Sequence, residues 1–179
     1  MTRIPPRLTA TGLQSRRLSL EPLRVEHATE AVAVFNDQRL HTYLGTAPET
    51  FNQLRGRFAR QVLGQSADGS EDWLNWMIRD RESGEIIGTV QSTVYHSGEL
   101  HDSTHLVAEV AWVVATPFQR RGVAVEAAGA MTEWLRGCGV DVVIAHIHPD
   151  NLASIGVARR LGLHPTDIVF HGEVRWRFP

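Results

Sequence analysis

Cysteine is nearly absent from this chain of 179 residues, since Cys138 is the only one. A disulfide within the chain needs two cysteines, so a disulfide-stapled secreted scaffold is disfavoured. Cys138 falls on the apolar stripe of an expected helix, where a free cysteine is usually buried and inert. The sequence therefore predicts a thiol in the core and not a catalytic nucleophile.

Long apolar runs and an excess of charge of one sign are also missing. No run approaches the ~18 residues that a membrane span needs, and the start, MTRIPPRLTATGL, has no apolar signal segment. The formal net charge of −2 provides no basic field for nucleic acid or an anionic membrane. We therefore expect a cytoplasmic protein with no nucleic-acid or membrane partner.

The chain contains no internal repeat, no low-complexity tract and no linker that would divide it. Its length suits one α/β domain with a well-buried core. Pro5, Pro6 and Gly12 interrupt regular structure in the first dozen residues. We expect a loose N-terminal arm over 1–13 and a single domain over 14–179.

Hydrophobic periodicity predicts the order β-α-α-β-β-β-α-β-α-β-β. This order indicates an α/β (α+β) fold: a mixed, mostly antiparallel central sheet of six to seven strands with about four helices and one βαβ unit in the second half. The final two strands should form a hairpin that turns at His171 and Gly172. The expected strands are at 16–20, 73–80, 85–95, 105–114, 140–148 and in the tail 168–178, and the expected helices are near 25–35, 49–63, 124–138 and 149–162.

The stretch QRRGVA, residues 119–124, joins an apolar strand to the most regular of these helices. Backbone N–H groups at a helix start have no intrahelical partner, and the helix dipole adds positive charge there, so a pyrophosphate would fit. Gly122 would let the backbone approach a phosphate closely. The alternative is a plain turn with solvated arginines, and spacing alone leaves both open. Neither a P-loop nor a G-x-G-x-x-G motif is present.

QRRGVA resembles the Q/R-x-x-G-x-G/A signature of the GNAT acetyltransferase superfamily. AEVAWVV precedes it, and HPDNLASIGVARRLGL at 148–163 is similar to the family's N-x-x-S-x-x-x-x-x-K/R-x-G-F/L segment. RRLSLEPLRVEHATEAVAVFND at 16–37 resembles the start of the branch that includes ribosomal-protein N-terminal acetyltransferases. The resemblance covers roughly residues 14–165 and implies a GNAT-like fold with acetyl-CoA as cosubstrate.

The resemblance also implies the cofactor site. The end of the strand at 105–114 would hold the pantetheine arm of acetyl-CoA and polarise its thioester carbonyl. The loop and helix start that follow would bind the pyrophosphate through backbone N–H groups. Asn151 would contact pantetheine, and Arg160 would lie near the adenosine 3′-phosphate. Ser154 falls where the family often places a hydroxyl near the departing sulfur. The implied cofactor-binding residues are Val113, Val114, Gln119, Arg120, Arg121, Gly122, Val123, Ala124, Val125, Asn151 and Arg160.

Transfer to an amine requires a base, because amines with pKa values of ~7.7–10.4 are mostly protonated at pH 7. Glu109 is the candidate: alternation places it on one strand face with Ala111 and Val113, where an unpaired carboxylate is costly. The related branch also often has a glutamate here. A Glu109 paired by a salt bridge to a neighbouring strand is the alternative, and both stay open. His148 is a further candidate to assist as base.

The acid position departs from the family pattern. Many members use a tyrosine soon after the Asn segment, whereas Tyr43 and Tyr95 both lie far upstream. The general acid could therefore be Ser154 or a water, or the reaction could use no dedicated acid. Ser154 can equally have a structural role, as a hydroxyl in the first turn of a helix. The histidines His96, His101 and His105 surround Asp102, but without a metal-site spacing they predict no metal.

The sequence thus indicates an acetyl-CoA-dependent N-acetyltransferase that transfers directly to a primary amine, either a small molecule or a protein N-terminus. Glu109 and Ser154 are the expected catalytic residues, and no metal is expected. The alternative is a non-catalytic module that senses acyl-CoA, which the missing late tyrosine keeps open. The aromatic tail hairpin offers a surface for a homodimer.

Overall fold

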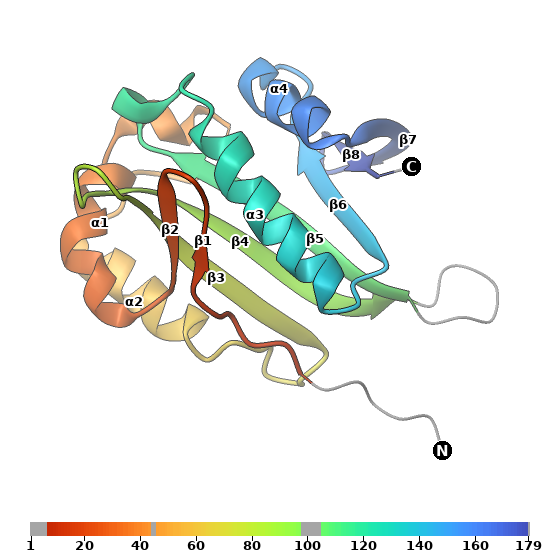
Figure 1. Ribbon diagram of the computed structural model, residues 1–179, viewed down its shortest axis with the longest axis horizontal. Helices are drawn as coiled ribbons and strands as arrows, with labels where there is room; N and C mark the ends of the chain where they lie inside the picture. The colour runs from red at the N-terminus through yellow and green to blue at the C-terminus, as the bar shows by residue number, and fades with distance from the viewer. Residues whose placement is uncertain (1–6, 44–45, 98–104, 179) are drawn as a thin grey trace.

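The computed structural model describes residues 7–43, 46–97 and 105–178. An eight-stranded sheet runs through it in the order β1-β2-β3-β4-β5-β6-β8-β7 (Figure 1). Among these strands β5 and β6 pair in parallel, and the other neighbours pair antiparallel. The strands are β1 (Leu13–Gln14), β2 (Leu18–Pro22), β3 (Glu71–Asp80), β4 (Ile86–Ser97), β5 (His105–Val114), β6 (Val142–Ile147), β7 (His164–Phe170) and β8 (Glu173–Arg177).

The expected fold class, a mixed and mostly antiparallel sheet with helices against it, is confirmed. The parallel pair β5–β6 encloses the one βαβ unit that the second half of the sequence predicts. The tail hairpin turns at His171 and Gly172, whose positive φ values of 49° and 84° suit a tight hairpin turn. Strand β1 is an eighth strand, and with two residues it is too short to give an alternating pattern.

Four α-helices appear where periodicity predicts them: α1 (Ala28–Phe35), α2 (Phe51–Gln61), α3 (Val123–Gly137) and α4 (Leu152–Leu161). Short 3-10 turns η1 (Val25–His27), η2 (Gln38–Thr42) and η3 (Thr116–Phe118) extend or connect them. The α2 start has a capping box between Thr50 and Gln53. The expected cap at Gly162 ends α4 with φ 87°.

The sheet separates two cores. On one face, α3 crosses the strands and encloses a core that contains Trp76 and Met131 (Figure 1). On the other face, α1 and α2 pack around Phe58 and Met77. All four side chains are buried, and truncating an aromatic such as Phe58 to alanine costs about 3–5 kcal/mol. Both cores hold the middle strands rigid, which fixes the position of the β5 end.

Strands β5 and β6 separate partway along their length. Their paired residues are Val107–Glu109 on β5 and Val142–Ile144 on β6. From Ile144 onwards β6 pairs with β8 on its other side. The remainder of β5 therefore has β4 on one side and a gap on the side facing β6, and this gap opens the molecule at the carboxyl ends of two parallel strands.

The two ends of the chain make different contacts. In the expected N-terminal arm, of which residues 1–6 lie outside the described part, the Leu8 N–H donates to Asp72 (2.8 Å) and Trp76 Nε1 donates to the Thr11 carbonyl (2.7 Å). At the other end, β7 forms an edge of the sheet and exposes apolar side chains, so the homodimer surface in the tail remains a prediction. None of the described helices is long and apolar enough to cross a membrane.

Candidate active site

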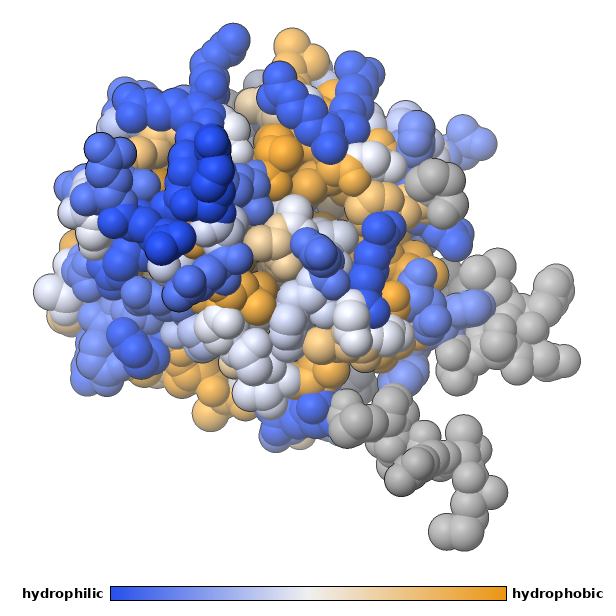
Figure 2. Space-filling view, in the orientation of Figure 1, coloured by the Kyte–Doolittle hydropathy of each residue, from blue (hydrophilic) through white to orange (hydrophobic). Residues whose placement is uncertain are grey.

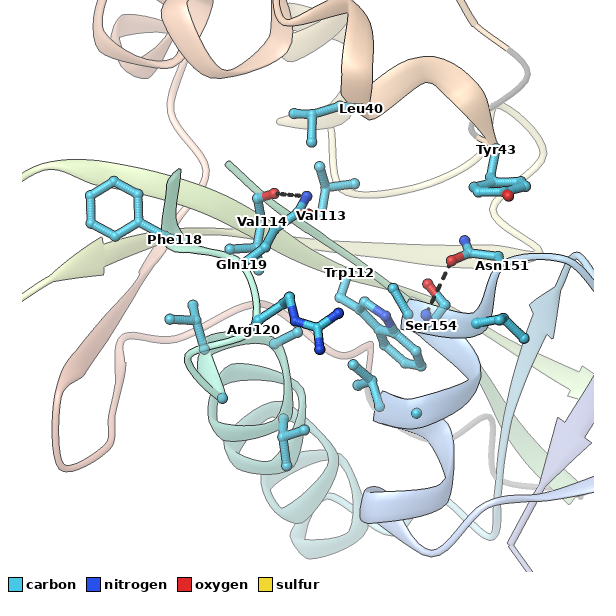
Figure 3. Close-up of a pocket in the computed structure, with 18 of the residues that line it drawn as sticks. Leu40, Tyr43, Trp112, Val113, Val114, Phe118, Gln119, Arg120, Asn151 and Ser154 are labelled. Carbon is cyan, nitrogen blue, oxygen red and sulfur yellow. Dashed lines mark hydrogen bonds between the residues drawn. The ribbon is translucent and has the colours of Figure 1, made fainter. Parts of the chain in front are cut away.

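A cavity of about 510 Å³ lies at the gap between β5 and β6 (Figure 3). Its walls are the β5 end, the loop and first turn of α3, the first turns of α4, and the η2 segment that follows α1. In the space-filling view, hydrophilic side chains cover most of this side of the molecule, and apolar side chains show between α3 and α4 (Figure 2). All expected catalytic and cofactor-binding residues line the cavity except Glu109 and Arg121, and His148, the further base candidate, does not line it either.

The loop before α3 has the backbone that a phosphate site needs. Arg120 has φ 61° and Gly122 has φ 77°, both in the left-handed region, and Gly122 is the N-cap of α3. The Glu126 N–H is the one that donates back to the Gly122 carbonyl (3.0 Å). The N–H groups of Val123, Ala124 and Val125 precede this first intrahelical bond, so they have no intrahelical acceptor. Together with the helix dipole they can hold an anion at the cavity wall.

Side chains fasten this loop to the strand before it. Gln119 Nε2 donates to the Val114 carbonyl at 2.9 Å (Figure 3). On the other side of β5 the Val113 carbonyl faces β4, where its oxygen is the nearest atom to a Cβ added at Gly88. Backbone directions alternate along a strand, so the peptide groups of Trp112 and Val114 face the gap. Trp112, which the family motif does not mark, also lines the cavity with its indole.

A polar clamp fixes the start of α3 against the β1–β2 turn. The Glu126 carboxylate accepts from the Arg17 N–H (2.8 Å), from Arg17 Nε (2.7 Å) and from the Ser15 hydroxyl (2.8 Å). Burial acts to raise the pKa of Glu126, but these donors and the Arg17 charge outweigh it and lower the pKa below its ordinary value. Arg17 Nη2 also donates to the Arg121 carbonyl (3.1 Å), which ties the loop before α3 to the β1–β2 turn.

The α4 wall carries the second expected motif. Asn151 caps α4, because its side-chain oxygen accepts from the Ser154 N–H at 3.1 Å (Figure 3). Ser154 is partly buried, and Arg160 is exposed one and a half turns further along the same helix. Asn151 thus has a structural role as helix cap beside any contact with pantetheine.

The η2 segment forms a wall that sequence reasoning missed. Tyr43 lines the cavity (Figure 3), and its ring lies 5.6 Å from the ring of His148, which directly follows β6. The Asp37 carboxylate anchors η2: it accepts from Arg39 Nε and Nη2 (2.9 Å each) and from the Thr116 hydroxyl (2.7 Å). These donors, Arg39 first, hold the pKa of Asp37 well below its usual range. Since Thr116 lies in η3, directly before the loop at 119–122, the Asp37–Thr116 hydrogen bond connects the η2 wall to that loop.

Glu109 lies outside the cavity, on the face of the sheet where α1 and α2 pack. It shares this face with Ala111 and Val113, and Val113 contacts the core of α1 and α2. Ala111 is exposed although β5 is an inner strand, so neither helix covers the sheet here. We call the surface of Glu109 and Ala111 the open sheet face. It leads from Glu109 to Val113 at the cavity.

Glu109 also has the partner on a neighbouring strand that the alternative interpretation expects. His146 Nδ1 on β6 lies 2.8 Å from Glu109 Oε1, while the Glu109 side chain remains 42% exposed. One oxygen of the carboxylate is therefore engaged, and the group stays accessible from the open sheet face. The two interpretations are compatible, because a paired carboxylate can still accept a proton.

The histidine cluster considered for a metal falls partly outside the described residues, since His101 and Asp102 lie there. Among residues 7–43, 46–97 and 105–178, no group of three His, Cys, Asp or Glu side chains is arranged to hold a metal ion. Cys138 caps the end of α3 and is partly buried, and burial raises the pKa of its thiol. A neutral thiol at the far end of α3 from the cofactor loop supports a structural role.

The chain belongs to the GNAT acetyltransferase family: the family model for the acetyltransferase (GNAT) domain matches residues 17–164. This family consists of enzymes that use acetyl-CoA, and the cavity with its loop and α3 start is where the family motif lies. Curated proteins provide no significant match.

Solved structures agree on the fold. An acetyltransferase from Agrobacterium tumefaciens has 23% identity and a TM-score of 0.69, covering 99% of both chains. A Vibrio cholerae protein assigned provisionally as a ribosomal-protein-serine acetyltransferase has 15% identity and a TM-score of 0.70 over 94% of this chain and 97% of its own. AAC(6')-Ib, solved with paromomycin and acetyl-CoA, has 18% identity and a TM-score of 0.73 over 90% and 93%. At these identities the likeness shows the fold and leaves the acceptor undefined.

Proposed function

We propose that this acetyltransferase moves the acetyl group of acetyl-CoA directly to a primary amine, on a small molecule or a protein N-terminus, with Glu109 as the base. The observation that carries the proposal is the exposed carboxylate of Glu109 on the open sheet face, on the same strand face as Val113 at the cavity. About 3.4 Å per residue separates strand positions, so a water can bridge Glu109 and an amine that lies over Ala111.

Cofactor binding uses the backbone of the cavity. The pyrophosphate lies against the N–H groups of residues 120–125, and the pantetheine arm runs along the gap between β5 and β6. Peptide groups of Trp112 and Val114 face this gap, so a hydrogen bond from one of them polarises the thioester carbonyl. Arg160 and Asn151 contribute contacts from α4. No metal takes part in the proposed reaction.

The chemical steps balance without another reactant. Glu109 takes one proton from the ammonium form of the amine, and the neutral nitrogen attacks the thioester carbon. The C–S bond breaks, CoA leaves as a thiolate, and the second nitrogen proton passes to the sulfur through Ser154 or a water. A thiol has a pKa of ~8.5, so the thiolate leaves readily and a strong acid is unnecessary. The absence of a tyrosine after Asn151 is consistent with this.

Release of free CoA thiol from acetyl-CoA tests the proposal, with a panel of polyamines, aminoglycosides and short peptides as acceptors. We expect turnover by the wild type and a loss of kcat/KM of about 100-fold or more in Glu109→Gln. The acetyl-CoA Kd should stay unchanged, because Glu109 lies outside the cavity. Glu133→Gln, on an exposed position of α3, is the matched control. Tight acetyl-CoA binding with no turnover of any amine would favour the acyl-CoA sensor instead.

A further inference from the structure

His146 connects two charged side chains, Glu109 of the open sheet face and Arg175 of β8. It lies on β6 opposite Arg175 of β8, and the paired residue of Glu109 on β6 is Ile144, two positions earlier. Residues two apart on a strand point to the same face, so Glu109, His146 and Arg175 lie on one side of the sheet. The imidazole is 8% exposed and has a partner at each ring nitrogen.

The partners determine the protonation of the ring. Arg175 Nε carries a hydrogen and no lone pair, and it donates to His146 Nε2 at 3.2 Å. His146 Nε2 therefore accepts, which leaves the proton of the neutral imidazole on Nδ1. That N–H donates to Glu109 Oε1 at 2.8 Å. The lone pair of His146 Nε2 is engaged by Arg175 and Nδ1 carries the proton, so neither ring nitrogen is free to take a proton from the acceptor.

We infer that His146 is a positioning residue of the acceptor site: it holds Glu109 Oε1 so that Oε2 is presented to the ammonium group of the acceptor. This inference rests on the proposed function. During proton transfer an N–H bond of the ammonium breaks, the bridging water relays the proton, and an O–H bond to Oε2 forms, while His146 keeps its proton throughout. Arg175 acts one step further away by fixing the tautomer of His146.

The neighbouring residues favour a fixed arrangement. The Phe170 ring on β7 lies 5.8 Å from the His146 ring and covers it, and the burial of His146 restricts its rotation. A carboxylate held by one buried donor loses less freedom when the amine binds than a free one does. Without the donor, Glu109 rotates on an exposed strand face, and a displacement of 1 Å from the productive position is enough to cost about 100-fold in rate.

Two substitutions separate a positioning role from a proton-accepting role. Asparagine places an amide N–H near the position of histidine Nδ1, so His146→Asn keeps the donor to Glu109 and cannot act as a base. His146→Leu retains bulk but removes the donor. We expect His146→Leu to lower kcat/KM for the amine about 10- to 100-fold and His146→Asn to retain most of the wild-type value. The exposed His164→Leu on β7 is the matched control.

Three results would overturn the inference: equal losses in His146→Asn and His146→Leu, full activity in His146→Leu, or a wild-type ring that carries its proton on Nε2. The last is read from the ring-nitrogen NMR spectrum of 15N-labelled protein, with the His146 signals assigned by their loss in His146→Asn. This readout needs no folded leucine variant. Acetyl-CoA Kd is measured for each variant. If Glu109→Gln keeps full activity, the proposed base is wrong. If Glu109→Gln loses activity but His146→Leu keeps it, the base stands and only the positioning role of His146 is wrong.

Discussion

The proposed cofactor site consists mainly of backbone from two helix starts in the cavity, whereas the proposed acceptor site, which extends from the cavity onto the open sheet face, consists of side chains from segments far apart in the chain. Residues 112–125 and 151–160 supply the first. The second consists of Tyr43, directly after η2, and of Glu109, His146 and Arg175, which lie on β5, β6 and β8. Backbone recognition suits a constant cosubstrate, because N–H groups bind any phosphate. Converging side chains suit an acceptor that differs between relatives.

Gly122→Glu should have the largest effect, and it should act on the cofactor site alone by weakening acetyl-CoA binding. Gly122 has φ 77°, which L-residues rarely adopt, and a carboxylate at the α3 start repels the pyrophosphate. We expect acetyl-CoA binding to weaken by ~100-fold or more, against a few-fold for Arg120→Ala, which removes one charge and keeps the backbone. Calorimetric titration measures both.

Gly137→Glu is the matched control at the other end of the same helix, where an added Cβ meets nothing within 4 Å. Equal affinities of Gly122→Glu and Arg120→Ala would contradict backbone recognition of the cofactor.

The next largest effect is expected at Gly88, which is remote from the motif. A Cβ in Gly88→Ala would clash with the Val113 carbonyl oxygen, so β4 or the β5 end must shift. We expect a loss of roughly 1–3 kcal/mol in the free energy of unfolding and about tenfold weaker acetyl-CoA binding, since the displaced strand end also carries the gap-facing peptides. Denaturant unfolding and calorimetry test this.

Gly129→Ala serves as its control, because there a Cβ meets only Leu161 Cδ2 at 3.7 Å. Undiminished affinity in Gly88→Ala would show that the β5 end tolerates displacement.

A smaller effect is expected from Glu126→Gln, which weakens the clamp between α3 and the β1–β2 turn. The variant should lose about 1–2 kcal/mol of stability near neutral pH, as charge-assisted hydrogen bonds become neutral. The folded pKa of Glu126 is lowered from 4.5, so its contribution is complete above that value and is lost as pH falls through the folded pKa.

The unfolding free energies of wild type and Glu126→Gln should therefore converge below about pH 4.5. The exposed Glu133→Gln on the same helix should show no such convergence. If the free energies of unfolding of wild type and Glu126→Gln differ by the same amount at every pH, the ionised Glu126 clamp is not the cause of the difference.

The same contrast explains what the sequence alone could reveal. Hydrophobic periodicity predicts seven of the strands and all four helices because each pattern lies within one element. The separation of β5 and β6 depends on β6 turning to β8, a pairing between residues far apart, so no local pattern records it. Likewise, the cofactor motif is contiguous and recognisable, while His146 and Arg175 acquire their relation to Glu109 only through strand register. In the sequence, His146 is a polar residue within the otherwise apolar stretch VVIAHI at 142–147, but nothing local indicates which side chains lie beside it.

The smallest effect is expected from Tyr43→Phe, which tests whether this distant tyrosine replaces the one missing after Asn151. Tyr43 lines the cavity with its ring beside His148. Phenylalanine keeps the ring and removes the hydroxyl, and because a thiolate leaves readily, kcat should fall less than about tenfold. Tyr43→Ala also removes the ring from the cavity wall, so it should raise KM for the amine while the acetyl-CoA Kd changes little. A loss of about 100-fold in kcat for Tyr43→Phe would instead make Tyr43 the general acid, and the acceptor side would then hold both proton-handling groups.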